Sequence, residues 1–170
     1  MAIEQTLILI KPDGAKRKLT GMVLDRLDAA GLTLAAAKVV SVSSELAREH
    51  YRNLKDKPFF EELIRYIRGE FHGIPDNRVL ALVYEGEGAV AAARKVAGVT
   101  NPEEAEPGTI RGSFGRITTA GRFENVLHAS GDASDAEHEI KLWFSPGEVL
   151  RAVYPSKSVN GRESKVLVWA

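Results

Sequence analysis

The chain alternates short apolar runs with segments of helical spacing, and this alternation constrains its fold more than any other feature. Apolar runs typical of strands lie at residues 6–10, 32–42, 79–84 and 123–128. Segments whose apolar residues recur at helical spacing lie between and after these runs, at residues 20–31, 44–51, 60–67, 89–97 and 136–143. The repeated order strand–helix–strand predicts an α/β fold and favours a split βαβ sandwich. A doubly wound parallel sheet would give a similar pattern, so the periodicity alone does not decide the topology.

The ends of these segments carry their own signals. Thr20 and Ser44 are the expected N-caps of the first two helices, because their hydroxyl groups can accept a hydrogen bond from a free backbone N–H. Residues 69–77 and 101–122 are rich in residues that break regular structure, so we expect loops there. Residues 166–169 form either a terminal strand or an apolar segment docked on the body.

Composition limits the kinds of partner that the chain can have. Its 170 residues, 44% of them apolar, suit one domain over residues 1–170. Lys plus Arg and Asp plus Glu both total 23, so no overall positive field attracts nucleic acid or an acidic membrane surface. The chain has no cysteine, no apolar run long enough to span a bilayer and no evident signal peptide. These absences predict a cytoplasmic protein with no membrane partner and no thiol chemistry.

His128 is the histidine whose position best fits a chemical role. It ends an apolar strand and is followed by a small polar turn that leads into a helix, a place where α/β proteins often bind ligands. The N–H groups at a helix start can hold a phosphate. His50, His72 and His138 are expected to be structural or solvated residues, because their local sequences offer no comparable setting.

A phosphohistidine reaction needs a neutral imidazole, an acceptor that orients it and cations that offset a polyphosphate. Glu139 is a candidate acceptor, and Lys11, Arg94 and Arg111 are candidate cations from three distant segments. The chain contains neither a P-loop motif nor the glycine fingerprint of dinucleotide binding. No histidine pair has the spacing of metal ligands, so we expect no metal site made by side chains.

The segment Asn125-Val126-Leu127-His128-Ala129-Ser130 resembles the signature of nucleoside diphosphate kinases, Asn-x-x-His-Gly/Ala-Ser-Asp. Other blocks are similar to the family in the same order and together cover most of residues 5–150: Lys11-Pro12-Asp13-Gly14, His50-Tyr51, Leu54-Lys55-Asp56, Pro58-Phe59-Phe60, Thr100-Asn101-Pro102, residues 107–112, Ala136-Glu137 and Leu142-Trp143-Phe144.

This resemblance implies a fold and a reaction. The fold is a ferredoxin-like sandwich with a four-stranded antiparallel sheet, an inserted helical pair and, at residues 151–170, a C-terminal extension. The reaction is a ping-pong exchange in which a nucleoside triphosphate phosphorylates a histidine and a second nucleoside diphosphate collects the phosphoryl group. Mg²⁺ is bound through the nucleotide phosphates. A homo-oligomer, either a tetramer or a hexamer, is also implied.

Catalytic roles carry over by position. His128 would be the phosphorylated residue, and Glu139 would orient its imidazole. Lys11 would contact the transferred phosphate and the sugar hydroxyl, with Asn125 beside it on the ribose. Tyr51 would lie near the histidine and the transferred phosphate.

Nucleotide-binding roles carry over in the same way. Arg94, Thr100 and Arg111 would bind the remaining phosphates. Phe59 would stack on the base, with Leu63 packed nearby. Because every base has a π face, stacking predicts broad base tolerance.

The chain departs from the family pattern at several places. Gly131 stands where the signature has aspartate, and Ser113 where the family usually has aspartate after Arg-Gly. An added loop lies at residues 69–78, residues 116–122 are lengthened, and the tail after about Val153 has no aligned counterpart. Asp132 or Ser134 is expected to replace a lost cap at the start of the following helix.

Two alternative functions are compatible with the sequence. A nucleotide-binding regulatory protein could keep the fold with weakened activity, because the two lost aspartates lie near the signature. A nucleic-acid-binding module is less favoured, since the charge is balanced and no strand is rich in aromatic residues.

Overall fold

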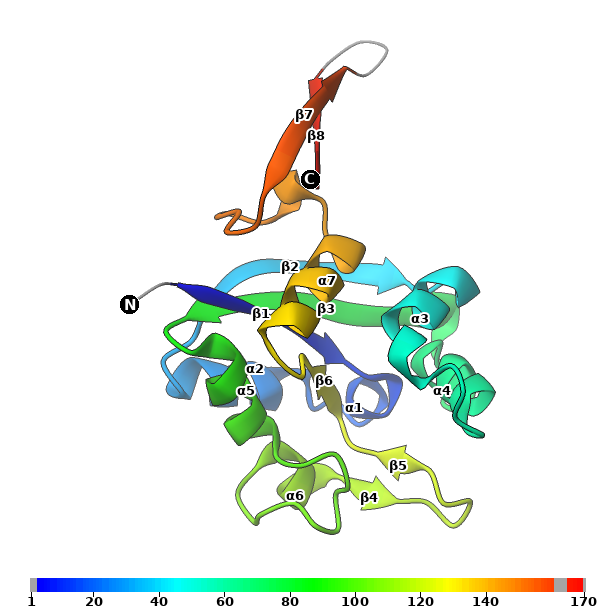
Figure 1. The fold of residues 1–170 in the computed structure, drawn as a ribbon. Coiled ribbons are helices and arrows are strands. Elements are labelled where there is room, and N and C mark those ends of the chain that lie inside the picture. The colour runs from blue at the N-terminus through cyan, green and yellow to red at the C-terminus, as the bar shows by residue number, and fades with distance from the viewer. Residues whose placement is uncertain (1–2, 161–164, 170) are drawn as a thin grey trace.

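The computed structural model describes residues 3–160 and 165–169 (Figure 1). The strands and helices follow one another in this order: β1 (Glu4–Ile10), α1 (Pro12–Lys16), α2 (Thr20–Ala29), β2 (Thr33–Ser41), α3 (Ser44–His50), η1 (Arg52–Leu54), α4 (Phe60–Ile67), η2 (Pro75–Asn77), β3 (Arg78–Gly86), α5 (Ala89–Ala97), α6 (Ile110–Phe114), β4 (Arg116–Ile117), β5 (Phe123–Glu124), β6 (Leu127–Ala129), α7 (Ala133–Trp143), η3 (Pro146–Glu148), β7 (Ser156–Asn160) and β8 (Lys165–Trp169).

The central sheet has four strands in the order β2-β3-β1-β6. Every pair in it is antiparallel, so β1 and β2 run parallel to each other with β3 between them. In the same way β3 and β6 are parallel with β1 between them. Each strand–helix–strand unit is therefore split by a strand from the other unit. This arrangement confirms the ferredoxin-like sandwich and excludes the doubly wound parallel sheet.

Helices cover both faces of the sheet because alternate residues of β1 point to opposite sides. Leu7 and Leu9 belong to a core that includes residues of α3, α4 and α7. Ile8 and Ile10 belong to a second core that includes residues of α2, α5 and α6. All four side chains are fully buried, which makes β1 the strand around which the domain packs. Its carboxyl end leads directly into the candidate site.

The strand expected over residues 123–128 is broken in the structure. Phe123 and Glu124 form β5, which pairs with β4, whereas β6 begins at Leu127 and pairs with β1. Between them, the backbone of Val126 has a φ of 72°, in the left-handed region. Long-range hydrogen bonds hold this residue, so the local apolar pattern did not reveal the break. The breaker-rich stretch before it also contains α6 and β4.

The helix starts differ by one residue from expectation. Ser43 caps α3, accepting a hydrogen bond from the Leu46 N–H at 3.1 Å, so the expectation for Ser44 was wrong. Leu19 occupies the N-cap of α2 and makes no side-chain bond there. Asp132 caps α7, as expected, and accepts a bond from the Asp135 N–H at 2.8 Å.

The C-terminal strands β7 and β8 form an antiparallel hairpin that projects away from the central sheet (Figure 1). A strand at residues 166–169 was one of two expectations, and β8 confirms it. The indole N–H of Trp169 donates to the Phe144 carbonyl at 2.5 Å, which joins the hairpin to the end of α7. Within residues 3–160 and 165–169, no helix has the length and apolar character needed to cross a bilayer.

Candidate active site

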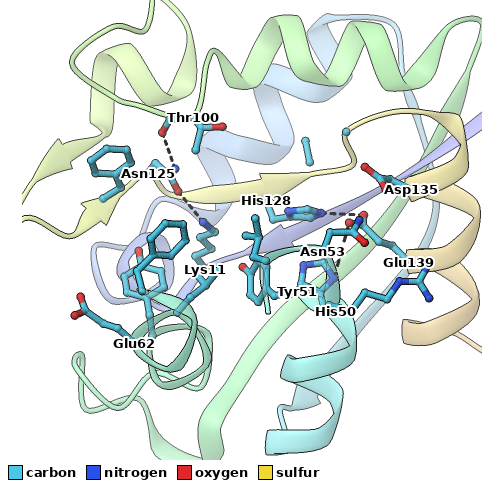
Figure 2. Close-up of a pocket in the computed structure, with 18 of the residues that line it drawn as sticks. Lys11, His50, Tyr51, Asn53, Glu62, Thr100, Asn125, His128, Asp135 and Glu139 are labelled. Carbon is cyan, nitrogen blue, oxygen red and sulfur yellow. Dashed lines mark hydrogen bonds and ion pairs between the residues drawn. The ribbon is translucent and has the colours of Figure 1, made fainter. Parts of the chain in front are cut away.

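A pocket of about 660 Å³ opens at the carboxyl end of β1. It is bounded by the α3–α4 pair, the start of α7 and the loops around β5 and β6 (Figures 1 and 2). All ten site residues expected from the sequence line it: Lys11, Tyr51, Phe59, Leu63, Arg94, Thr100, Arg111, Asn125, His128 and Glu139. Segments more than 100 residues apart in the chain thus meet in one cavity.

His128 lies on β6, opposite Leu9 of β1. Its Nε2 is 2.9 Å from Glu139 Oε2, and its side chain is 17% exposed. Burial lowers the pKa of His128 well below its usual value, and the nearby charges of Lys11, Arg111 and Arg94 lower it further. The imidazole is therefore neutral at physiological pH. When its Nε2 proton is donated to the carboxylate, the lone pair lies on Nδ1.

Glu139 is held in place from a second side. Its Oε2 also accepts a hydrogen bond from the Ser130 hydroxyl at 2.7 Å, and Ser130 is fully buried. Burial raises the pKa of Glu139, while His50 and the bond from Ser130 oppose this rise. A carboxylate fixed in this way can orient an imidazole and stabilise a positive charge that develops on it.

Lys11, Asn125 and Thr100 form a hydrogen-bonded chain on the opposite side of the pocket (Figure 2). The Lys11 ammonium donates to Asn125 Oδ1 at 2.8 Å, and the Asn125 amide donates to the Thr100 carbonyl at 2.8 Å. Burial and the charge of Arg111 lower the pKa of Lys11 to about 8, while Asp13 opposes the shift. This lysine is a buried cation close to the neutral histidine.

Arg111 and Arg94 add positive charge to the same side. Arg111 is 6% exposed, and its two Nη groups donate to the carbonyls of Gly98 and Leu127 at 2.8 and 3.0 Å. Burial and the charge of Arg94 lower the pKa of Arg111 to about 10. Arg111 therefore also fastens α6 to the end of α5 and to β6, whereas Arg94 projects from α5 and is exposed.

The aromatic residues of the pocket differ in exposure. Tyr51 is 8% exposed, and its buried hydroxyl has no hydrogen-bond partner among the described residues. Burial and the charge of Glu139 raise its pKa, so the phenol keeps its proton. Phe59 is 51% exposed and stands at the start of α4, with Leu63 one turn further along. A flat ligand group can lie against Phe59.

His50, which the sequence did not single out, is a buried neighbour of His128. Its ring centroid lies 4.5 Å from that of His128, and its Nδ1 accepts a bond from the Trp143 indole N–H at 3.2 Å. Burial and the charge of His128 lower its pKa well below the usual value. The sequence near His50 could not reveal its position in the pocket, because its partner Trp143 lies 93 residues away in the chain.

The fold also brings together groups that could ligate a metal ion. Nitrogen atoms of His50 and His128 and an oxygen of Glu139 lie within 4.8 Å of one another. Sequence spacing did not reveal this cluster, because its members come from α3, β6 and α7. The hydrogen bond between His128 and Glu139 already engages two of the three side chains.

The left-handed backbone of Val126 is pinned on both sides by the turn after β1. The Val126 N–H donates to Asp13 Oδ2 at 2.9 Å, and its carbonyl accepts from the Lys11 N–H at 2.9 Å. Asp13 also accepts a bond from the Tyr66 hydroxyl at 2.6 Å. A Cβ at Gly14 would meet the Val126 carbonyl oxygen at 2.7 Å, so this close approach requires glycine. The pinned peptide sets the direction in which β6 presents His128.

Comparison with known proteins identifies the chain. The family model described as nucleoside diphosphate kinase matches residues 4–149. The chain belongs to the nucleoside diphosphate kinase family. It is an enzyme that exchanges phosphoryl groups between nucleoside triphosphates and diphosphates.

Relatives and solved structures agree with this membership. The nucleoside diphosphate kinase of Crocosphaera subtropica is 48% identical over 147 residues, 86% of this chain and 91% of that protein. A structure of the kinase from Halobacterium salinarum in complex with CDP has a TM-score of 0.76 at 36% identity, covering 89% of this chain and 93% of the other. A transition-state mimic of the Borrelia burgdorferi kinase with vanadate and ADP has a TM-score of 0.77 at 34% identity, covering 88% and 92%.

The two departures from the family's aspartates have different settings. A Cβ at Gly131 would meet Asp135 Oδ2 at 2.5 Å, so the space beside the glycine is taken by another carboxylate. Because Asp132 caps α7, the helix start keeps its hydrogen bond without an aspartate at Gly131. Ser113 is exposed on α6 and does not line the pocket.

Proposed function

We propose that this nucleoside diphosphate kinase works by a ping-pong mechanism in which His128 Nδ1 is the nucleophile. In the first step Nδ1 attacks the γ-phosphorus of a nucleoside triphosphate, and a P–N bond forms as the bond to the β–γ bridging oxygen breaks. The diphosphate leaves. In the second step a β-phosphate oxygen of another diphosphate attacks phosphorus, and the electron pair of the P–N bond returns to Nδ1.

The neutral state of His128 carries this proposal. Its lowered pKa keeps the imidazole neutral, and its bond of 2.9 Å to Glu139 directs the single ring proton to Nε2. Phosphorylation of Nδ1 makes the ring cationic, and the Glu139 carboxylate stabilises that charge. His50 packs edge-on at 4.5 Å and limits rotation of the ring.

The cations opposite the histidine would hold the phosphates. We assign the transferred phosphate and the sugar hydroxyl to Lys11, the ribose to Asn125, and the remaining phosphates to Arg94, Thr100 and Arg111. Each of these residues lines the pocket. Their positive charge would offset the charge that develops on phosphate oxygens during transfer.

We assign the remaining pocket positions to the base and to the transferred phosphate. Phe59 and Leu63 would contact the base, and their place at the exposed end of the pocket supports this assignment. Tyr51 would donate its unpartnered hydroxyl to the transferred phosphate. Because stacking does not depend on the identity of the base, all common nucleotides would be accepted.

Mg²⁺ would enter with the nucleotide. Lys11, Arg94 and Arg111 line the phosphate end of the pocket and repel a free cation. Mg²⁺ prefers oxygen ligands, so phosphate oxygens and water suit it better than these side chains. When bound there, it neutralises phosphate charge.

We also propose that residues 1–170 form one domain. This domain would assemble into a tetramer or hexamer in the cytoplasm. The edge strand β2 supports self-association, because its Leu34 and Val39 side chains are 40% and 66% exposed. Light scattering of the purified protein measures the assembly size directly. A monomer at micromolar concentration would contradict this part of the proposal.

Labelling with γ-³²P-ATP and Mg²⁺ tests the mechanism. The wild type should form an acid-labile, alkali-stable phosphoprotein, and alkaline hydrolysis should release the Nδ1 isomer of phosphohistidine. His128→Ala should form none and should lose exchange activity by a factor on the order of 10⁴ or more. His138→Ala, which removes another histidine of the pocket, serves as the control and should still be labelled. An unlabelled wild type would favour the regulatory alternative.

A further inference from the structure

Two segments that depart from the family pattern meet at one end of the pocket. The ring of Phe71, in the added loop, lies 4.0 Å from the guanidinium carbon of Arg122, at the end of the lengthened segment. The same ring also lies 4.9 Å from the guanidinium carbon of Arg65. Arg122 Nε also pairs with Glu62 Oε1 of α4 at 2.7 Å. The guanidinium of Arg122 is thus held by an aromatic ring and a carboxylate.

The paired strands β4 and β5, which flank the loop that contains Arg122, are also fixed. Arg116 of β4 and Phe123 of β5 belong to these two strands. The Glu124 carboxylate is 2.6 Å from Arg116 Nε and 2.9 Å from His72 Nε2. His72 is 7% exposed, so it is a structural residue and not a solvated one. Arg122 itself is held by one carboxylate and one aromatic ring, and the Arg116–Glu124 ion pair joins the two strands on either side of its loop.

Glu62 and Arg122 both line the pocket. Figure 2 shows Glu62 and Glu139 at opposite ends of the cavity. Phe59, to which the base is assigned, lines the pocket three residues before Glu62. A nucleotide with its phosphates beside His128 would bring the edge of its base toward the pair of Glu62 and Arg122.

The pair leaves hydrogen-bonding groups available to a ligand. Among the described residues, Glu62 Oε2 and both Nη groups of Arg122 have no side-chain partner. The pair therefore offers an acceptor next to a two-pronged donor. Guanine carries the complementary set on one edge, with O6 as acceptor and N1–H and N2–H as donors. Adenine and cytosine place an amino donor where guanine has O6, so their amino group would face the guanidinium.

We propose that Glu62 and Arg122 are specificity-determining residues that favour guanine nucleotides over adenine and cytosine nucleotides. This inference rests on the proposed orientation of the nucleotide in the active site. Stacking on Phe59 allows every base to bind, and the Glu62–Arg122 pair sets the relative affinities of the nucleotides. Guanosine diphosphate ranks first. Inosine and uridine diphosphates follow, because they keep the keto acceptor and the ring N–H but lack the guanine amino group.

The preference is modest because the pair is partly solvated. The side chains of Glu62 and Arg122 are 46% and 31% exposed. Water competes for both groups, so we expect discrimination of about tenfold between guanine and adenine nucleotides and not the far larger factors of buried polar sites.

Equilibrium titration calorimetry with GDP, IDP, ADP and CDP tests the inference without any phosphoryl transfer. Wild-type enzyme should bind GDP about tenfold more tightly than ADP, with IDP between them. Glu62→Gln should bring the GDP and ADP affinities within about twofold of each other, since one acceptor oxygen becomes a donor. Arg122→Lys should also reduce the preference, because lysine lacks the fork of N–H groups.

Glu61→Gln is the matched control. Glu61 is the neighbouring glutamate on α4, pairs with Arg48 at 2.8 Å and does not line the pocket. It should keep the wild-type preference. Equal affinity of the wild type for GDP and ADP, or an unchanged ratio in Glu62→Gln, would overturn the inference.

Phosphoenzyme labelling separates this result from the mechanism. If the wild-type enzyme is labelled but binds GDP and ADP equally, the His128 mechanism stands and the guanine preference set by Glu62 and Arg122 is overturned. If the enzyme is not labelled but still binds GDP more tightly, and this preference depends on Glu62, the mechanism is overturned and the guanine preference stands.

Discussion

The two ends of the pocket are built in opposite ways. At the inner end, Lys11 and Glu139 are 8% and 6% exposed, and both are hydrogen-bonded. At the outer end, the paired side chains of Glu62 and Arg122 are 46% and 31% exposed. Burial shifts the pKa values of the inner groups and fixes their geometry, whereas water weakens each contact at the outer end. Under the proposed mechanism the inner end would carry the phosphoryl transfer, and a change at the outer end would leave the geometry of the inner end intact.

Glu139→Gln should give the largest effect among variants that keep His128. The amide can still accept a hydrogen bond but carries no charge to stabilise a cationic ring, so kcat should fall by about 100-fold. Glu137→Gln is the control, because Glu137 lies on the same helix and pairs with Lys141 at 2.8 Å. Steady-state exchange assays give both values. A loss below about threefold in Glu139→Gln would show that the buried carboxylate is dispensable.

The pH dependence should separate the inner end from the outer end. Lys11 has a pKa of about 8, so it loses its charge as the pH rises through that value and the phosphates lose a cation. The kcat/KM for ATP should therefore fall about tenfold per pH unit above about 8. Because the pKa of His128 is lowered, the histidine should cause no loss between pH 8 and 6.5.

Lys11→Arg sharpens this test. Arginine has a higher pKa than lysine, so the fall near pH 8 should disappear even if the maximal rate is lower, and only the loss of the Arg111 charge near pH 10 should remain. Profiles of kcat/KM from pH 6.5 to 10 measure the difference. An alkaline fall at the same pH in Lys11→Arg would assign it to another group. The GDP-to-ADP ratio should stay constant below pH 8 in both enzymes.

Phe71→Leu should give the smallest effect. Leucine keeps an apolar side chain but has no π face for the guanidinium of Arg122, so this guanidinium should move more freely. The ratio of GDP to ADP affinity should fall by about two- to threefold, with phosphoenzyme formation unchanged. Calorimetry and labelling of the same preparation check both values. A larger loss of labelling than of base preference would tie the added loop to the chemistry.

The sequence predicted the regular elements of the fold and the pocket residues better than it predicted the contacts between distant segments. The strands β1 and β3 and the helices α4 and α5 were found because their apolar periodicity is local. The resemblance located the ten pocket residues. It could not locate His50 as a neighbour of His128, or the break at Val126, because both depend on partners distant in the chain. The contact of Phe71 with Arg122 joins the segment predicted as an added loop to the segment predicted as lengthened, so the resemblance offered no guide to it and only the fold reveals it.

The pinned peptide of Val126 couples the geometry of the active site to the turn after β1. A valine with positive φ is unfavourable until Asp13 and Lys11 supply their hydrogen bonds, and β6 pairs with β1 through only three residues. A partly folded chain would therefore hold His128 without its orientation. A nucleotide binds only the completed arrangement, so by mass action it draws the population toward the native state. Substrate would in this way act as a ligand that protects the enzyme from heat.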